Sequence, residues 1–242
     1  AMLPGVRETD IPVPDAKNSV WKLNAETIGV YRVAYSPEHL AKLGKAAAQK
    51  DSAFSLEDRV GLVSDAFTLA QAGYSKTSGG LALMHALRGD NSSLVNTAAA
   101  LNLGKLASVW WEQPQSVRDG INRFRADVFG PMARELTFEF GANDSSELRE
   151  LRETVITAAA SAGDTWTLDE IRRRFAPLQE HGDYSLIHPD LLRTVLSQAV
   201  KHGGEAEYET VMGVYRAPPT PAHKTSAMVA LGTTQDLSLI HI

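Results

Sequence analysis

The stretch from Ser55 to Tyr74, SLEDRVGLVSDAFTLAQAGY, carries both the start and the stop signal of an amphipathic helix. Ser55 is a good N-cap, Asp58 stands in capping-box position, and Gly73 supplies a left-handed stop. Apolar residues at spacings of three and four predict one buried face, made of Leu56, Val60, Val63, Phe67 and Ala70. One helix cannot bury that face alone, so we expect other helices to pack against it.

The same kind of helical signal recurs through residues 36–236. Periodicity and caps predict roughly ten helices, near 36–49, 55–74, 78–87, 93–112, 117–130, 148–163, 167–178, 189–203, 208–215 and 227–231. Gly130-Pro131 is expected to break or kink the fifth, and a further helical piece is expected through Leu136 and Phe140 to Gly141. The fold class predicted is mainly α, an α-solenoid-like stack of antiparallel helix pairs, although no strict repeat period is present.

Residues 1–35 lack the helical pattern of the rest of the chain. Residues 1–18 hold three of the eleven prolines and predict a loose or extended segment. Residues 19–35 are rich in β-prone side chains, interrupted by Asn24 and Gly29, and predict a short β-hairpin. The domain boundaries expected are therefore 1–18, 19–35 and 36–236.

Composition removes several classes of function. The net charge of −5 gives no electrostatic case for nucleic acid or for an anionic membrane surface. The absence of Cys excludes disulfides and thiolate metal sites within the sequence. No apolar run approaches a membrane span and no secretory signal is visible, so we expect a soluble, cytoplasmic protein.

A series of short motifs resembles the C-terminal helical domain of zinc aminopeptidases of the puromycin-sensitive type. The residues in these motifs are most similar to those of fungal members. The first match is Asp58-Arg59 followed by residues 62–70 and Ala72-Gly73. In chain order the other matches are Trp21 to Asn24, Gly29 to Tyr35, Ser36 to Leu40, Ala162 to Asp164, Ile187 to Leu191 with Arg193 and Val195, and Gly203-Gly204. Each motif is weak alone, and their order over residues 19–236 carries the resemblance.

The resemblance implies a fragment of such an enzyme. Residues 19–35 would be the remnant of a β-sandwich domain, and the helices would form a curved bowl that faces the zinc site, shapes the substrate chamber and contacts bound peptides. The partners implied are the parent catalytic domain and peptide substrates. Arg193 is the best candidate for a peptide carboxylate and Arg59 a weaker one. A salt bridge is the alternative for Arg193, and a helix-start role beside Asp58 for Arg59.

The family's chemistry cannot be assigned to this sequence. Zinc aminopeptidases hold their metal with H-E-x-x-H, yet none of the seven His residues is followed by Glu. We therefore expect no catalytic residue, metal ligand or cofactor here, and zinc only in the parent's catalytic domain. His181, Asp183, His188 and Asp190 form the densest metal-like cluster, but their spacing favours loop and capping roles.

Two other readings stay open. A stand-alone helical interaction scaffold could bind a protein partner on a concave face. Arg88-Gly89-Asp90 spells an integrin-recognition tripeptide, although the same residues fit a helix end followed by a turn. The basic run Arg172-Arg173-Arg174 predicts a solvated helix face rather than an anion site.

The last six residues, LSLIHI at 237–242, match the translation of a common sequencing-library adapter. We therefore expect a non-native tail and a helix stack that lacks its final members. Apolar surface near Met228 and Leu231 would then be exposed, and the protein could self-associate through this end.

Overall fold

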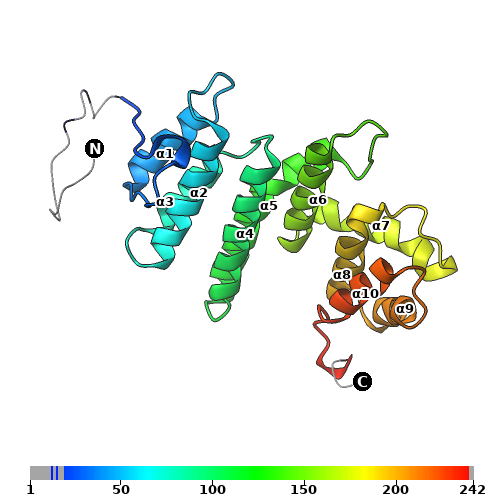
Figure 1. Ribbon diagram of the computed structural model, residues 1–242. Helices are drawn as coiled ribbons and strands as arrows, with labels where there is room; N and C mark the ends of the chain where they lie inside the picture. The colour runs from blue at the N-terminus through cyan, green and yellow to red at the C-terminus, as the bar shows by residue number, and fades with distance from the viewer. Residues whose placement is uncertain (1–11, 13–14, 16–18, 240–242) are drawn as a thin grey trace. The chain divides into compact units, whose positions relative to one another are not determined.

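The computed structural model describes residue 12, residue 15 and residues 19–239 (Figure 1). The chain divides into two compact units, Ala1–Leu87 and Arg88–Ile242. The described residues are mainly helical and include no strand. The expected loose segment at 1–18 lies almost wholly outside the described residues. None of the described helices is long and apolar enough to cross a membrane.

The first unit is built on α1 (Pro37–Ala47), α2 (Leu56–Gln71) and α3 (Thr77–Ala86). The capping box predicted at the start of α2 is present, since Ser55 Oγ accepts from Asp58 N and Asp58 Oδ2 accepts from Ser55 N. Gly73 takes the expected positive φ, of 80°. The buried stripe includes Val63 and Phe67 but is rotated from the one predicted, because Leu62 and Ala66 are buried instead of Leu56 and Val60.

The predicted hairpin at 19–35 is wrong. This segment contains only the short 3₁₀ helix η1 (Ala25–Thr27) and no strand pairing. A hairpin needs further strands or a packed face for stability, and here Ile28 and Val30 are 77% and 105% exposed. Side chains hold the segment to the helices instead: Lys22 Nζ lies 2.7 Å from Asp58 Oδ1, and Asp65 Oδ2 accepts from Val33 N.

The second unit contains seven α-helices among its described residues. They are α4 (Ser93–Val109), α5 (Gln115–Leu136), α6 (Ser146–Ser161), α7 (Thr165–His181), α8 (Leu192–His202), α9 (Glu205–Arg216) and α10 (Pro221–Leu231), with 3₁₀ turns η2 (Pro189–Leu191) and η3 (Leu237–Leu239). Each helix contacts the next and the next but one. Helices α4, α6, α8 and α10 thus form one layer, and α5, α7 and α9 the other. This layering is observed for the second unit alone.

Proline is tolerated inside two of these helices. Pro131 lies within α5, which runs to Leu136, so no break is observed and the helix does not reach Gly141 as predicted, while a kink at Gly130-Pro131 stays a prediction. Residues 137–145 form a loop that we call the α5–α6 loop. Pro177 lies within α7 in the same way. Helix α7 also begins earlier than predicted, because Asp164, and not Thr167, accepts the capping hydrogen bond.

The last residues of the chain were predicted to be a non-native tail. Residues 237–239 form η3, and Leu239 is buried. Residues 240–242 lie outside the described part. Met228 in α10 is 56% exposed, as expected for apolar surface at this end, whereas Leu231 is only partly exposed. The origin of the tail and self-association stay predictions.

Candidate functional site

Three helices of one layer are joined by a row of polar side chains. Thr97 Oγ1 of α4 lies 3.5 Å from Thr154 Oγ1 of α6. Thr157 Oγ1 of α6 lies 2.6 Å from Thr194 Oγ1 of α8, and Gln198 Nε2 donates to Ser161 Oγ at 3.4 Å. Between α6 and α8 the residue numbers of the two bonded pairs rise together, so these two helices run parallel. We call the six residues Thr97, Thr154, Thr157, Ser161, Thr194 and Gln198 the polar face.

A groove of about 500 Å³ runs along the polar face between α4 and α6. Its walls include Leu101 from α4 and Glu150, Glu153 and Thr157 from α6, and α5 contributes Arg125 from beneath. Leu101 is 57% exposed. The α4–α6 groove therefore combines apolar surface, hydroxyl groups and charges of both signs, which are the contacts that an extended peptide can use.

Arg193 lies beside this groove on α8 and is exposed. Its guanidinium forms no hydrogen bond or ion pair with another described residue, so the salt bridge considered as the alternative is not observed within that part of the chain. Arg193 acts electrostatically on Glu153 of α6. Desolvation is the largest cause of that carboxyl's raised pKa, Asp190 adds to it, and Arg193 opposes it. Arg193 is thus available to a carboxylate ligand, and its binding role stays a prediction.

Arg59 belongs to the first unit and has a structural contact. Its Nη1 donates to the carbonyl oxygen of Phe54 at 3.2 Å, which ties α2 to the loop in front of it. The neighbouring Asp58 is buried and holds Lys22, Ser55 N and Glu26 N. Burial acts to raise the pKa of Asp58, but these hydrogen bonds outweigh it and leave the pKa lowered. The contact agrees with the helix-start role, and peptide binding by Arg59 is untested.

The tripeptide Arg88-Gly89-Asp90 forms the turn between α3 and α4. Arg88 and Gly89 are exposed, and Gly89 has a φ of 85°. Asp90 Oδ1 accepts from Ser92 N, and Asp90 O accepts from Asn96 Nδ2. Asp90 therefore organises the start of α4, in agreement with the turn reading. Adhesion through this tripeptide is untested.

The histidine and arginine clusters are largely structural. His188 Nδ1 accepts from Asp190 N at the start of η2, and the His188 ring stacks on Phe140. Among the described residues no group of three or more His, Cys, Asp and Glu side chains could hold a metal ion. In the basic run, Arg172 and Arg173 are exposed as predicted, but Arg174 is buried and pairs with Glu139. The solvated face therefore comprises two of the three arginines.

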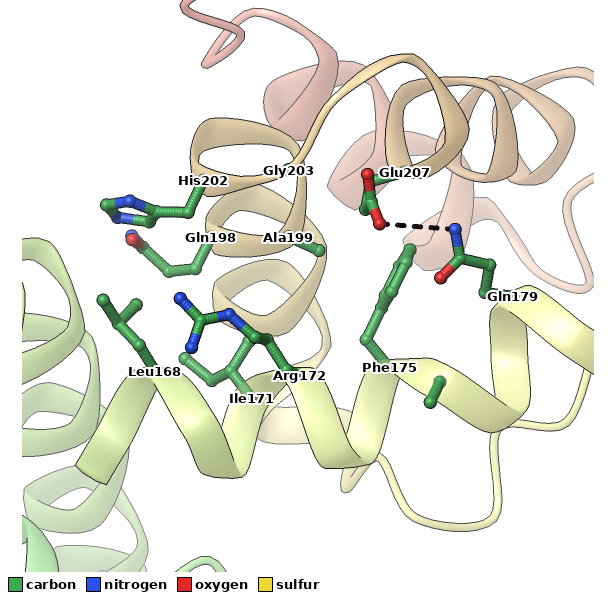
Figure 2. Close-up of a pocket in the computed structure, with 11 residues that line it drawn as sticks. Leu168, Ile171, Arg172, Phe175, Gln179, Gln198, Ala199, His202, Gly203 and Glu207 are labelled. Atoms are coloured by element: carbon green, nitrogen blue, oxygen red, sulfur yellow. Dashed lines mark hydrogen bonds between the residues drawn. The ribbon is translucent and has the colours of Figure 1, made fainter. Parts of the chain in front are cut away.

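A second pocket, of about 310 Å³, lies between α7, α8 and α9 (Figure 2). Ile171 and Phe175 form its apolar middle. Gln198, His202 and Arg172 gather at one end, and Gln179 and Glu207 at the other, where Gln179 Nε2 donates to Glu207 Oε1 at 3.4 Å. Gln198 Oε1 is buried without a hydrogen-bond partner. Because Gln198 also contacts Ser161, it links this pocket to the polar face.

The comparisons with known proteins agree with this architecture. The family model described as the ERAP1-like C-terminal domain matches residues 21–241. This chain belongs to that family. Aminopeptidase 2 of Candida albicans is 29% identical over 226 residues, which cover 93% of this chain and 24% of that protein. The alanine/arginine aminopeptidase of Saccharomyces cerevisiae is 30% identical over 221 residues, 91% of this chain and 25% of that protein.

The resemblance to aminopeptidases, including fungal ones, is thereby confirmed. Likeness also extends to the puromycin-sensitive aminopeptidase of Caenorhabditis elegans, 26% identical over 220 residues. The chain spans about a quarter of the length of these relatives. It therefore corresponds to one helical domain of a much longer kind of protein.

Sequence reasoning missed the two charged residues that most distinguish the groove, Arg125 and Glu153. Arg125 was detectable in principle. It stands four residues after Ile121 and three before Val128, on the apolar stripe of α5, where a charge signals either a buried pair or a ligand site. Glu153 carries no such signal, because it is one of three acidic residues, with Glu147 and Glu150, in the first half of α6.

Proposed function

We propose that this chain is the non-catalytic helical domain of a zinc aminopeptidase, and that its polar face and α4–α6 groove contact peptide substrates. The observation that supports this most is the position of Arg193, exposed and unpaired among the described residues, beside a groove lined by hydroxyl groups and Glu153. Hydroxyl groups can exchange partners with a peptide backbone, and an exposed arginine can bind a carboxylate. Catalysis and zinc are assigned to the parent's catalytic domain.

Length selection follows from this arrangement if the groove faces the chamber of the parent enzyme. A peptide held at one end by the catalytic domain would reach the groove only when it is long enough. Solenoid-like curvature of the whole helical domain is part of this proposal. The parent catalytic domain is the expected protein partner, and exposed apolar residues on and after α4, such as Leu94 and Trp111, suit such a contact.

The test is fluorescence anisotropy of the full chain with a ten-residue peptide labelled near its C-terminus. We expect a saturable rise, and Arg193→Ala should weaken binding by about 1.5 kcal/mol, roughly tenfold, because a charge-assisted hydrogen bond is lost. Arg216→Ala is the control, since Arg216 is also exposed but lies on α9 of the other layer.

Two results would contradict the proposal. If the anisotropy does not change on addition of the protein, a scaffold that binds protein partners becomes the better interpretation of the function. A slow, protein-dependent fall below the value for free peptide, followed over hours with zinc present, would indicate cleavage and would show that the chain has an active site.

A further inference from the structure

Arg125 is a buried cation with little to neutralise it. Its side chain lines the α4–α6 groove, and the residue is only 8% exposed. Nη1 donates to Asn122 Oδ1 at 3.0 Å, and Nε is buried without any hydrogen-bond partner. No carboxylate of the described residues lies within ion-pair distance of its guanidinium. An uncompensated buried charge is strongly unfavourable, so an anion bound beside the Arg125 guanidinium would stabilise this arrangement.

The other two buried arginines of the described residues show what compensation looks like. Arg152 Nη1 lies 2.7 Å from Asp144 Oδ2, and Arg152 Nε donates to the carbonyl of Leu136. Arg174 Nη2 pairs with Glu139 Oε1. Arg125 is as buried as these two residues, but it forms no ion pair with a described residue, and Glu150 and Glu153, which line the same groove, are not within ion-pair distance of it.

A second cation lies near Arg125. Lys201, in the last turn of α8, is partly buried, and desolvation and then the charge of Arg125 lower its pKa. Burial likewise lowers the pKa of Arg125. Ser161 lies on the same groove, and its Oγ accepts from Gln198 Nε2, which leaves the hydroxyl proton for another acceptor. Arg125 and the hydroxyl proton of Ser161 are therefore both available in the groove, and Lys201 adds positive charge near Arg125.

We infer that the α4–α6 groove is a carboxylate-binding site, with Arg125 as the buried residue that binds the carboxylate and Ser161 as a supporting donor. A guanidinium can hold a carboxylate through two parallel hydrogen bonds, and the low local polarity strengthens them. The carboxylate can come from the C-terminus of a peptide or from an acidic side chain. This inference rests on the proposed peptide contact for its biological ligand, but its chemistry can be tested without a peptide.

The first experiment uses N-acetylalanine as the probe and N-acetylalaninamide as its neutral match. Thermal unfolding of the full chain is followed with each compound at equal ionic strength. N-acetylalanine should raise the unfolding temperature of the wild type and of Arg123→Met, an exposed neighbour on α5, but not that of Arg125→Met. Equal stabilisation of Arg125→Met, or no difference between acid and amide for the wild type, would overturn the site.

The second experiment identifies the source of the carboxylate. Three labelled ten-residue peptides are compared by anisotropy: one with a free C-terminus, one amidated, and one amidated with an internal Glu. Arg125→Met should weaken whichever carboxylate-bearing peptide binds more tightly by about tenfold to a hundredfold, and should leave the uncharged peptide unchanged. Should Arg125→Met fail to fold, Arg125→Lys serves, because it keeps the charge and loses the second hydrogen bond.

The two proposals fail in different ways. If all three peptides bind wild type and Arg125→Met equally, the carboxylate site is wrong and the peptide contact stands. If no peptide binds but N-acetylalanine stabilises the wild type and Arg123→Met and not Arg125→Met, the carboxylate site stands and the proposed function is wrong.

Discussion

A buried arginine contacts the α5–α6 loop and another lines the α4–α6 groove, and the difference between them separates a folding role from a binding role. Arg152 holds the loop through Asp144 and the Leu136 carbonyl, and its guanidinium lies 4.6 Å from the centre of the Phe140 ring. Arg125 has one amide oxygen and an open groove. The role of a buried charged residue therefore depends on the groups that it contacts and cannot be inferred from its burial alone.

The largest effect is expected in the loop. Arg152→Met should lower the free energy of unfolding by about 3 kcal/mol, because it leaves Asp144 and the Leu136 carbonyl without their partner. Urea unfolding followed by circular dichroism measures this. Arg149→Met is the control on the same helix. Its ion pair with Asp190 is exposed, so a loss of no more than about 1 kcal/mol is expected. Similar losses in both variants would remove the distinction.

The loop should also give a pH signature. Hydrogen bonds from Gly141 N and from Arg152 lower the pKa of Asp144. Stability from this carboxylate is present above the pKa of an unfolded Asp, about 3.9, and is lost as pH falls through the lower folded pKa. The stability difference between wild type and Asp144→Asn should therefore shrink on acidification. Urea unfolding at a series of pH values checks this, and a constant difference would contradict it.

The smallest loss of stability is expected in the groove. Arg125→Met should lower the free energy of unfolding by less than about 1 kcal/mol or should raise it, because an apolar side chain of similar length replaces an uncompensated charge. Urea unfolding of this variant beside Arg152→Met makes the comparison direct. A loss as large as that of Arg152→Met would show that Arg125 supports the fold and is not held for a ligand.

Much of the fold could be predicted from local sequence signals. Caps and stops located most helices, as Ser55, Asp58 and Gly73 do for α2, because these features depend on residues within one turn. The N-terminal segment could not be predicted in this way. Val30 and Tyr31 favour strands, but a strand needs pairing partners from elsewhere in the chain. Pro131 predicted a break in the helix, but α5 continues through it.

The site was harder to predict than the fold. Arg193 was identified through a family resemblance, and the structure places it exposed beside the groove. Arg125 was missed because the observation that marks it is the lack of an ion pair with any carboxylate of the described residues. That can be seen only once α4, α5 and α6 are packed together. Thr157 and Thr194 are far apart in sequence, and no local sequence pattern predicts that they pair.

The most direct test of the central claim is to map where a peptide touches the chain. A ten-residue peptide with a photoreactive group at its centre is crosslinked to the full chain, and the modified residues are identified by mass spectrometry. The account predicts adducts on α4, α6 and α8 around the α4–α6 groove, near Leu101, Glu150 and Arg193, and their suppression by excess unlabelled peptide. Adducts confined to α1–α3, or spread evenly over the surface, would contradict it.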